Sequence, residues 1–203
     1  MTCKIISTEF ISLFLCNKIP IYWNISKSFL NYLNNSIELD NGPQGITLNS
    51  INSVSSNYGV FVDASTSAIN QISISNSQFN DNDTAIYLES TVIGLLVTNN
   101  YFIVYQNSGS NGIYANNTST VYTRGSIVSN TFIQATGTVI GNGINLNSEG
   151  PLAVTGNFFT GLGYGIYLTS GSTLINVQSN TYTNNTTNVD NLSTTNTIGG
   201  GSS

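Results

Sequence analysis

Histidine is absent from this chain, and charged residues are scarce. Four Lys and Arg residues and nine Asp and Glu residues occur among 203, so that 6% of the chain is charged, whereas an average domain has about 25%. The lack of histidine excludes His-based catalytic triads and His-ligated metal sites. The formal charge of −5 argues against nucleic acid as a partner, because phosphates are bound by Lys and Arg.

Cysteine and long apolar runs are scarce as well. The two cysteines, Cys3 and Cys16, do not make a disulfide framework, and both a single pair and two free thiols are open. The apolar stretch at residues 10–16 is shorter than the roughly 20 residues that cross a bilayer. It is also a poor signal peptide, because no small-residue cleavage site follows it. The sequence therefore predicts no insertion into a membrane.

What the chain does contain is a repeat that begins at Ile46. One pattern places an aromatic residue five positions after a β-branched one, and the other is Gly or Ala followed by apolar, any and apolar residues. Successive aromatics lie 23, 30, 27 and 23 residues apart, and repeats of this size indicate a stack of like units. The first pattern occurs at residues 74–79, 97–102, 127–132, 154–159 and 177–182, and the second at 59–62, 85–88, 112–115, 143–146 and 165–168.

Both patterns have the period of two that is typical of strands. Ile86 and Leu88 alternate with Tyr87 and Glu89, which predicts one buried face and one exposed face. Each repeat thus predicts two strands of about four residues. Hairpins do not explain why the patterns recur in constant order, whereas a chain that winds one coil per repeat does. Equivalent strands of neighbouring coils would then pair in parallel, about 4.8 Å apart.

Asn-x-aromatic triplets mark the turn in four of these repeats. They begin at Asn100, Asn130, Asn157 and Asn180. Together with the Gly-Ile-x-Leu strands, they resemble the right-handed parallel β-helix of pectate-lyase-like proteins and phage tailspikes. The resemblance implies an all-β solenoid, stacks of like residues inside it and ladders of Asn side chains at the turns. It also implies an extracellular or virion-surface location and allows a homotrimer.

The repeat divides the chain into three parts. Residues 45–192 are predicted to form about six coils. Residues 1–44 carry no repeat and are predicted to cover the first coil, with a short amphipathic helix at residues 26–33. Residues 193–203 end in Gly-Gly-Gly-Ser-Ser and are predicted to be a flexible tail.

Aligning the Gly-Ile-x-Leu strands predicts two outward columns of side chains. Four aromatics in one exposed column favour glycan binding, because a Tyr ring offers both an apolar face and a hydroxyl. A plain sheet surface or a contact between subunits would also account for them, since Tyr is favoured in strands. The first column is Phe61, Tyr87, Tyr114, Asn145 and Tyr167, and the second is Asp63, Glu89, Asn116, Asn147 and Thr169.

Asp63 and Glu89 are the candidate catalytic residues. They occupy equivalent places on consecutive coils, so that their backbones should lie about 5 Å apart. Retaining glycosidases use two carboxyls about 5–5.5 Å apart, and two acids this close would raise one pKa. The sets that the resemblance would supply are missing: neither the clustered calcium-binding Asp residues of pectate lyases nor the His of polygalacturonases is present. Residues 81–83, Asp-Asn-Asp, lack the Gly and distal Glu of a calcium loop and read as a solvated turn.

Three functions therefore remain open. The first is a non-catalytic adhesion or tail-fibre module that binds surface polysaccharide through Phe61, Tyr87, Tyr114, Tyr167, Asn116 and Asn147. The second is a tailspike-like glycan depolymerase, a glycoside hydrolase that uses Asp63 and Glu89. The third is a structural fragment of a larger β-helix protein. The sequence predicts no cofactor and no metal site, and the lack of a complete catalytic motif favours the first function.

Overall fold

The structure is a computed structural model that describes most of the chain, with side chains from residue 24 onward. The described residues are 3–8, 11–16, 21–39, 44–63, 68–105, 107–117, 122–134, 137–138, 140–147 and 149–201.

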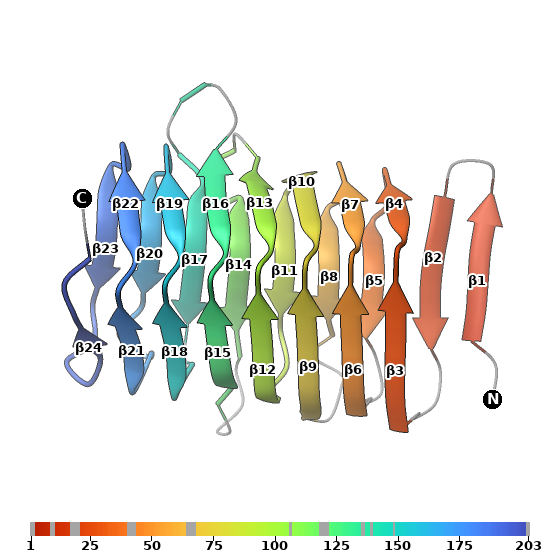
Figure 1. The fold of residues 1–203 in the computed structure, drawn as a ribbon, viewed down its shortest axis with the longest axis horizontal. Coiled ribbons are helices and arrows are strands. Elements are labelled where there is room, and N and C mark those ends of the chain that lie inside the picture. Colours follow the sequence, from red (N-terminus) through yellow and green to blue (C-terminus); the bar gives the residue numbers. More distant parts are fainter. Residues whose placement is uncertain are drawn as a thin grey trace.

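Three sheets run the length of the molecule, and the chain passes through them in the order B, C, A (Figure 1). Sheet A contains β1 (Cys3–Thr8), β2 (Ile11–Cys16), β5 (Asn35–Leu39), β8 (Tyr58–Val62), β11 (Thr84–Leu88), β14 (Asn111–Asn116), β17 (Asn142–Asn147), β20 (Tyr164–Leu168) and β23 (Thr187–Asn191). Sheet B contains β3 (Ile21–Ser26), β6 (Gln44–Asn49), β9 (Ile69–Ser75), β12 (Val92–Thr98), β15 (Arg124–Val128), β18 (Leu152–Thr155), β21 (Ile175–Gln178) and β24 (Thr197–Ile198). Sheet C contains β4 (Phe29–Asn31), β7 (Asn52–Val54), β10 (Gln78–Asn82), β13 (Tyr101–Val104), β16 (Thr131–Gln134), β19 (Phe158–Thr160) and β22 (Thr181–Thr183).

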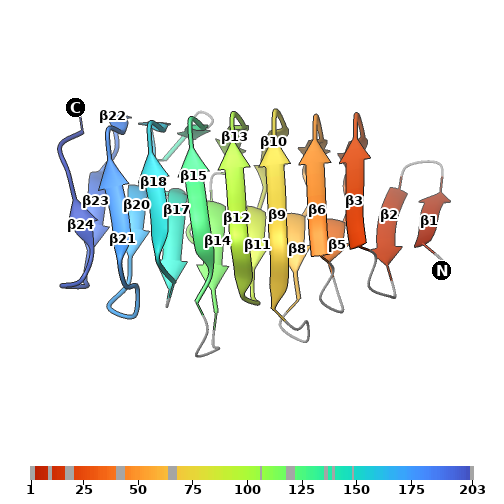
Figure 2. The ribbon, with the colours of Figure 1, turned by 60° about the horizontal axis from the view of Figure 1, so that its bottom comes forward.

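The predicted all-β solenoid is confirmed. Each coil takes one strand from each sheet, and every strand pairs in parallel with its equivalent in the next coil, as in β11 with β14. Figure 2 shows the strands of sheet B lying side by side in sequence order along the whole stack. Coils 2 to 7, from β6 to β23, are the six predicted from the repeat.

Each coil has three strands rather than the predicted two. The first pattern is continuous in the sequence, but in the structure the chain bends sharply within it, between sheets B and C. In coil 4 the bend consists of Asn99, whose φ is 54°, and Asn100. A residue in this left-handed conformation ends the strand β12, and the aromatic Phe102 then belongs to the separate strand β13.

The interior consists of straight rows of identical or similar side chains. Two rows that the sequence predicted are confirmed, with every member at most 1% exposed: Ile74, Val97, Ile127, Val154 and Val177 on sheet B, and Ile86, Ile113, Ile144 and Ile166 on sheet A. A third row on sheet C stacks Phe79, Phe102, Phe132, Phe159 and Tyr182 with ring centroids 4.5 to 5.4 Å apart. Parallel pairing in register aligns equivalent residues, so like side chains pack on like.

The asparagine ladder expected from the resemblance is also present. The side-chain oxygen of Asn130 accepts hydrogen bonds from the backbone and side-chain nitrogens of Asn100, at 2.9 and 3.0 Å. Asn157 accepts from Asn130 in the same way, and Asn180 accepts from Asn157. All four residues are at most 3% exposed. The buried turn between sheets B and C therefore satisfies its polar groups internally.

The predicted start of the regular coils near residue 45 is wrong for residues 21–39. Strands β3, β4 and β5 pair in parallel and in register with β6, β7 and β8, so they form coil 1. The helix predicted at residues 26–33 is wrong as well. Leu30 is 2% exposed and Phe29 63% exposed, which is the alternation of a strand, and pairing with β7 determines the conformation where the local pattern was ambiguous.

Before coil 1, the strands β1 and β2 pair antiparallel and extend sheet A next to β5 (Figure 1). They are the only antiparallel pair among the described strands. The covering of the first coil by this part of the chain stays a prediction.

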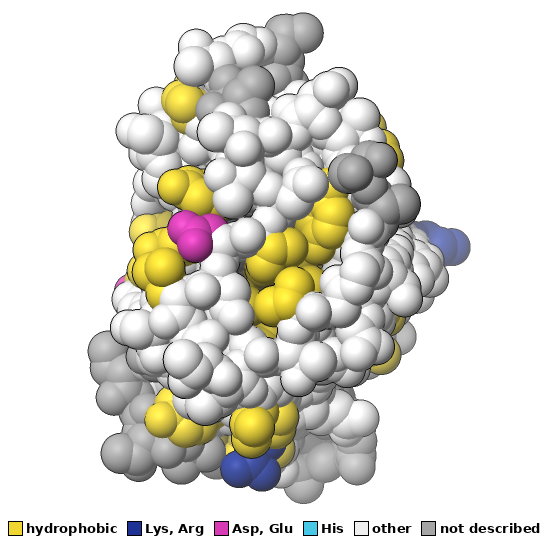
Figure 3. Space-filling model, turned by 90° about the vertical axis from the view of Figure 1, so that its left-hand side faces the viewer, with side chains coloured by type: hydrophobic (Ala, Val, Ile, Leu, Met, Phe, Trp, Pro, Cys, Tyr) yellow, Lys and Arg dark blue, Asp and Glu magenta, His cyan; other side chains and the backbone are white. Residues whose placement is uncertain are grey.

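The predicted flexible tail is wrong in its first half. Strand β24 pairs in parallel with β21, and the side chain of Asn196 accepts a 3.0 Å hydrogen bond from the backbone of Ile175. The stack thus ends on a partial eighth turn rather than at residue 192. Figure 3 looks onto this C-terminal end, where apolar side chains gather in the centre of the face. Leu192 and Ile198 are 54% and 42% exposed.

Candidate functional site

The first outward column predicted from the sequence is a column in the structure. Phe61, Tyr87, Tyr114, Asn145 and Tyr167 are register partners along sheet A, and Glu38 and Asp190 continue the row at its two ends. The rings of Tyr87 and Tyr114 stack with centroids 5.1 Å apart and planes 7° from parallel. Parallel coils bring equivalent side chains together, and the two Tyr rings on neighbouring strands therefore stack on one another in an aromatic column.

Tyr58 widens this aromatic column. It stands at the start of β8, three residues before Phe61, and its ring lies 5.1 Å from the rings of both Phe61 and Tyr87. Tyr58 was not predicted from the sequence, because it lies just outside the Gly-Ile-x-Leu pattern from which the outward columns were aligned. Tyr58 directly precedes the Gly of that pattern, and its register partner in the next coil is Thr84. Extending the alignment by one residue would have found it.

The hydroxyls of Tyr87 and Tyr114 remain protonated at neutral pH. Burial, together with the carboxylate of Glu89, holds the pKa of Tyr87 well above its usual value of 10, and burial with the nearby Glu89 raises the pKa of Tyr114. The hydroxyl of Tyr87 is hydrogen-bonded to Glu89 and to Asn116. Both rings therefore present neutral edges with hydroxyl groups rather than phenolates.

In the second outward column, side chains of neighbouring coils form hydrogen bonds with one another. The side-chain nitrogen of Asn147 donates to the Asn116 oxygen at 2.6 Å, and the hydroxyl of Thr169 donates to the Asn147 oxygen at 2.7 Å. These contacts fix the orientation of both amides.

Asp63 and Glu89 directly follow β8 and β11, at equivalent points of coils 2 and 3. The backbone nitrogen of Glu89 donates to the carbonyl of Val62 at 3.0 Å, which places the two residues on adjoining strands as the alignment predicted. Glu89 is engaged with Tyr87. Neither carboxylate lines the groove described next.

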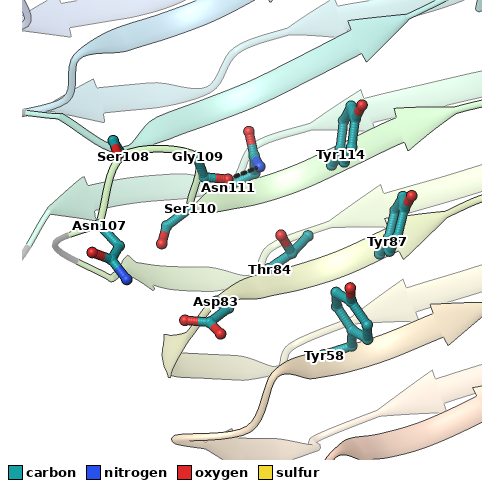
Figure 4. Close-up of a pocket in the computed structure, with 10 residues that line it drawn as sticks. All are labelled: Tyr58, Asp83, Thr84, Tyr87, Asn107, Ser108, Gly109, Ser110, Asn111 and Tyr114. Carbon is teal, nitrogen blue, oxygen red and sulfur yellow. Dashed lines mark hydrogen bonds between the residues drawn. The ribbon is translucent and has the colours of Figure 1, made fainter.

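A groove of about 350 Å³ lies beside the tyrosine column. One wall is formed by the rings of Tyr58, Tyr87 and Tyr114, and the opposite wall by the turn of residues 107–110 (Figure 4). Asp83 and Thr84 lie between the two walls, and the side chain of Asn111 is held by a 2.5 Å hydrogen bond to the carbonyl of Gly109. An apolar aromatic surface thus faces a wall of small polar groups.

The polar wall exists because the turn between sheets C and A is longer in coil 4 than in coil 3. Only Asp83 separates β10 from β11, whereas six residues separate β13 from β14. This difference is visible in the sequence as the wider spacing from Phe102 to Gly112 than from Phe79 to Ala85. Residues 107–110 were not among the site residues predicted from the sequence.

A second cleft, of about 320 Å³, adjoins the first. It is lined by Tyr32, Ser55, Ser56, Asn57, Asp81, Asp83 and Tyr105. Asp83 belongs to both clefts. The carboxylate that the sequence analysis read as part of a solvated turn therefore stands at the junction of two hollows in the surface.

Among the residues predicted as a site, the structure brings Tyr87 and Tyr114 together in the groove. Phe61 contacts the same aromatic cluster, with its ring 5.6 Å from that of Tyr87. Tyr167 lies two coils beyond Tyr114, separated from it by Asn145, and packs against Tyr164 at 5.3 Å. Phe61, Tyr167, Asn116 and Asn147 share the face of sheet A but do not line the groove.

One further carboxylate, that of Glu149, is buried at the turn between sheets A and B. Its two oxygens accept hydrogen bonds from the backbone nitrogens of Asn117, at 3.1 Å, and Thr123, at 2.8 Å. Burial raises the pKa of Glu149 to about 7 in spite of these hydrogen bonds. Since Glu149 is 0% exposed, it holds the turn that precedes β15 and does not belong to the groove.

In the described part of the chain, no cluster of three or more His, Cys, Asp or Glu side chains could hold a metal ion. The same residues include no helix of the length and apolarity that crossing a membrane requires. No family model, no curated protein and no solved structure matches this chain.

Proposed function

We propose that this protein is a glycan-binding module that recognises polysaccharide at a cell surface, and that it acts outside the cell or on a virion. The observation that carries the proposal is the stacked aromatic column of Tyr87 and Tyr114, which forms one wall of a groove whose other wall is polar. A parallel β-solenoid is a fold common among proteins that bind or degrade polysaccharide, and the fold by itself does not decide between activities.

The groove offers both kinds of contact that a sugar needs. The C–H face of a pyranose is apolar and can pack on a Tyr ring, while the ring's hydroxyl hydrogen-bonds at the edge. Asn107, Ser108 and Ser110 supply donors and acceptors on the opposite side. Small-molecule sites have this general composition, with a mainly apolar wall and a few placed polar groups.

The test is a glycan array probed with the wild-type protein and with Tyr114→Ala. Wild-type protein should bind a subset of glycans, and Tyr114→Ala should lose at least tenfold in affinity for them while unfolding at nearly the same denaturant concentration. The matched control is Tyr101→Ala, because Tyr101 is 41% exposed but lies on sheet C outside both clefts. Loss of folding in Tyr114→Ala would instead favour a subunit contact, such as that of a homotrimer. Absence of binding to every glycan rejects the proposal.

A hydrolytic activity is the alternative, supported by the equivalent positions of Asp63 and Glu89 on consecutive coils. Glycoside hydrolysis requires two carboxyls on either side of the scissile bond, and neither of these lines the groove. We therefore expect no new reducing ends when bound polysaccharide is incubated with the protein. If cleavage occurs and both Asp63→Asn and Glu89→Gln abolish it while binding persists, the depolymerase function is correct.

A further inference from the structure

We propose that the glycan is an uncharged chain lying across both clefts, with the carboxylate of Asp83 at the point where it passes from one to the other. This inference rests on the glycan-binding function proposed above and specifies the ligand of that site. Two independent observations support it: the shared lining of the two clefts and the sign of the charge around them.

The two clefts adjoin and share part of their lining. Asp83 lines both, and the turn after β13 contributes Tyr105 to the second cleft and residues 107–110 to the first. Each cleft alone, at about 350 and 320 Å³, is at the lower limit of small-molecule sites, which span roughly 300–1,000 Å³. A single sugar would leave one of them unused, whereas a chain of several units would occupy both.

The second cleft repeats the aromatic and polar composition of the first. Tyr32 and Tyr105 are 71% and 40% exposed, so their rings are accessible at its rim, and Ser55 and Asn57 supply polar groups. Tyr32 adopts a left-handed backbone conformation, with φ of 53°, which is uncommon for a bulky residue. The turn thus keeps this ring outside coil 1 instead of returning it to the core.

The charge near the clefts is of one sign. Asp83 lines both clefts and Asp81 lines the second. On the adjoining sheet A, Glu38 lies in β5, and Asp63 and Glu89 directly follow β8 and β11. The described Lys and Arg residues from position 24 onward are Lys27, which follows β3, and Arg124, which belongs to β15 on sheet B. Neither lines a cleft. A glycan with uronate or sialate groups would bring its anions against this field, and like charges placed together at an interface oppose binding.

The Asp83 carboxylate is suited to hydroxyl donors. Ionised carboxylates only accept hydrogen bonds, and the side chain of Asp83 has no hydrogen-bond or ion-pair partner among the described residues. Adjacent hydroxyls of a neutral sugar can donate to its two oxygens, and such charge-assisted hydrogen bonds are stronger than neutral ones. A carboxylate group on the sugar could not donate to Asp83 and would add repulsion.

The experiment compares neutral, sialylated and uronate-containing glycans on one array at about 0.15 M salt, where charges beyond about 8 Å are screened. Binding should be confined to neutral glycans. For a neutral glycan that binds, calorimetry with oligosaccharides of increasing length should show affinity rising at least tenfold until both clefts are filled. Binding of acidic glycans as tight as that of neutral ones, or affinity independent of length, overturns the inference while leaving the proposed function intact.

Variants separate the two clefts. Tyr32→Ala should lower affinity for long oligosaccharides about fivefold or more and leave affinity for the shortest bound ligand unchanged. Phe29→Ala is the control, since Phe29 is 63% exposed and lines neither cleft. Asp83→Lys should weaken binding of neutral glycans and reduce the discrimination against acidic ones. Equal effects of Tyr32→Ala on short and long ligands contradict a chain that spans the clefts, and failure of the wild type to bind any glycan rejects the proposed function itself.

Discussion

The corner between sheets B and C differs from the other two corners of the solenoid in being constant. In all seven coils it contains two residues, the first of which has φ between 51° and 65°. The turns between sheets C and A vary from one residue to seven, and those between sheets A and B from three to seven. At a corner that every coil repeats, the polar groups can form hydrogen bonds with the equivalent groups of the neighbouring coils. At a corner that varies in length, the polar groups of each coil need partners of their own.

The buried polar groups show this difference directly. At the constant corner, Asn100, Asn130 and Asn157 each donate to the next asparagine along the stack. At the variable corner between sheets A and B, a single side chain, Glu149, accepts from both ends of the seven-residue turn that precedes β15. At the repeated corner, neutral amides thus form hydrogen bonds with one another. In the irregular turn, a buried carboxylate accepts the hydrogen bonds of the backbone.

The largest expected loss of stability concerns the apolar interior, and it sets the scale for the effects expected at the corners. Ile113→Asp places a charge in the middle of the row Ile86, Ile113 and Ile144, which is completely buried. Burying an unpaired charge is among the most destabilising changes a protein can undergo, and we expect the free energy of unfolding to fall by more than about 4 kcal/mol. Urea denaturation measures the loss. A loss below about 1 kcal/mol would mean that the row is not packed as described.

The next effect tests the constant corner. Asn130→Ala removes the acceptor of two hydrogen bonds from Asn100 and the donor to Val97 and Asn157. Leaving buried polar groups without partners costs about 1–3 kcal/mol for each, and we expect a total loss of about 3 kcal/mol in urea denaturation.

The control for Asn130→Ala is Asn107→Ala, because Asn107 is exposed in a variable turn. Its effect should stay within about 0.5 kcal/mol. Equal losses at the two positions would contradict the distinction between the corners.

The third effect concerns the carboxylate at the variable corner. Because the pKa of Glu149 is raised from 4.5 to about 7, the folded protein binds this proton more tightly than the unfolded chain. Ionisation therefore opposes folding: the penalty is absent below about pH 4.5, grows as the pH rises towards 7 and is complete above it. A shift of this size corresponds to roughly 3 kcal/mol.

The measurement is the difference in unfolding free energy between wild type and Glu149→Gln at pH 5 and pH 8. Other carboxylates contribute equally to both proteins and cancel. The stability of the wild type relative to Glu149→Gln should fall between pH 5 and pH 8. A difference that is constant over this range would show that Glu149 has an ordinary pKa in the folded state.

The smallest effect sharpens the account of the constant corner. Gly156 occupies its first position in coil 6 with φ of 65°, and an added Cβ would meet nothing closer than the Ser129 hydroxyl oxygen, at 3.8 Å. Gly156→Ala should therefore lose only the conformational preference, about 1 kcal/mol. The reverse change, Ser129→Gly, at the equivalent place with φ of 56°, should stabilise slightly or not at all, because glycine also gains freedom in the unfolded chain. Thermal denaturation resolves both.

The sequence predicted the rows that repeat and missed what deviates from the repeat. Ile74, Val97 and Ile127 could be placed in one buried row because parallel pairing carries the same spacing from coil to coil. The strands of residues 21–39 escaped because coil 1 completes neither sequence pattern. It has Leu30 at the place of Phe102 and Ser36 at the place of Gly112. Their pairing with coil 2 depends on contacts between coils, which local patterns do not contain.

The site was predictable to a similar extent. Tyr87 and Tyr114 follow from the column alignment, which the pairing of β11 with β14 confirms. The groove beside them depends on the turn of residues 107–110, and the conformation of a variable turn is not fixed by any period. From the sequence, Asp83 was predicted to lie in a solvated turn. The residues that line the clefts with it, Tyr58 and Tyr105, come from the preceding and following coils.

The constant two-residue corner also gives the molecule a way to change in evolution. The strands of each coil pair only with those of the coils on either side, so that these interactions do not depend on the total number of coils. Duplication or loss of a whole coil would leave every remaining asparagine with the same kind of neighbour. New residues can meanwhile enter at the two variable corners without shifting the register, as the six-residue turn before β14 illustrates. The inner rows and the asparagine ladder can thus stay unchanged, while the turns beside sheet A change in length and sequence one at a time.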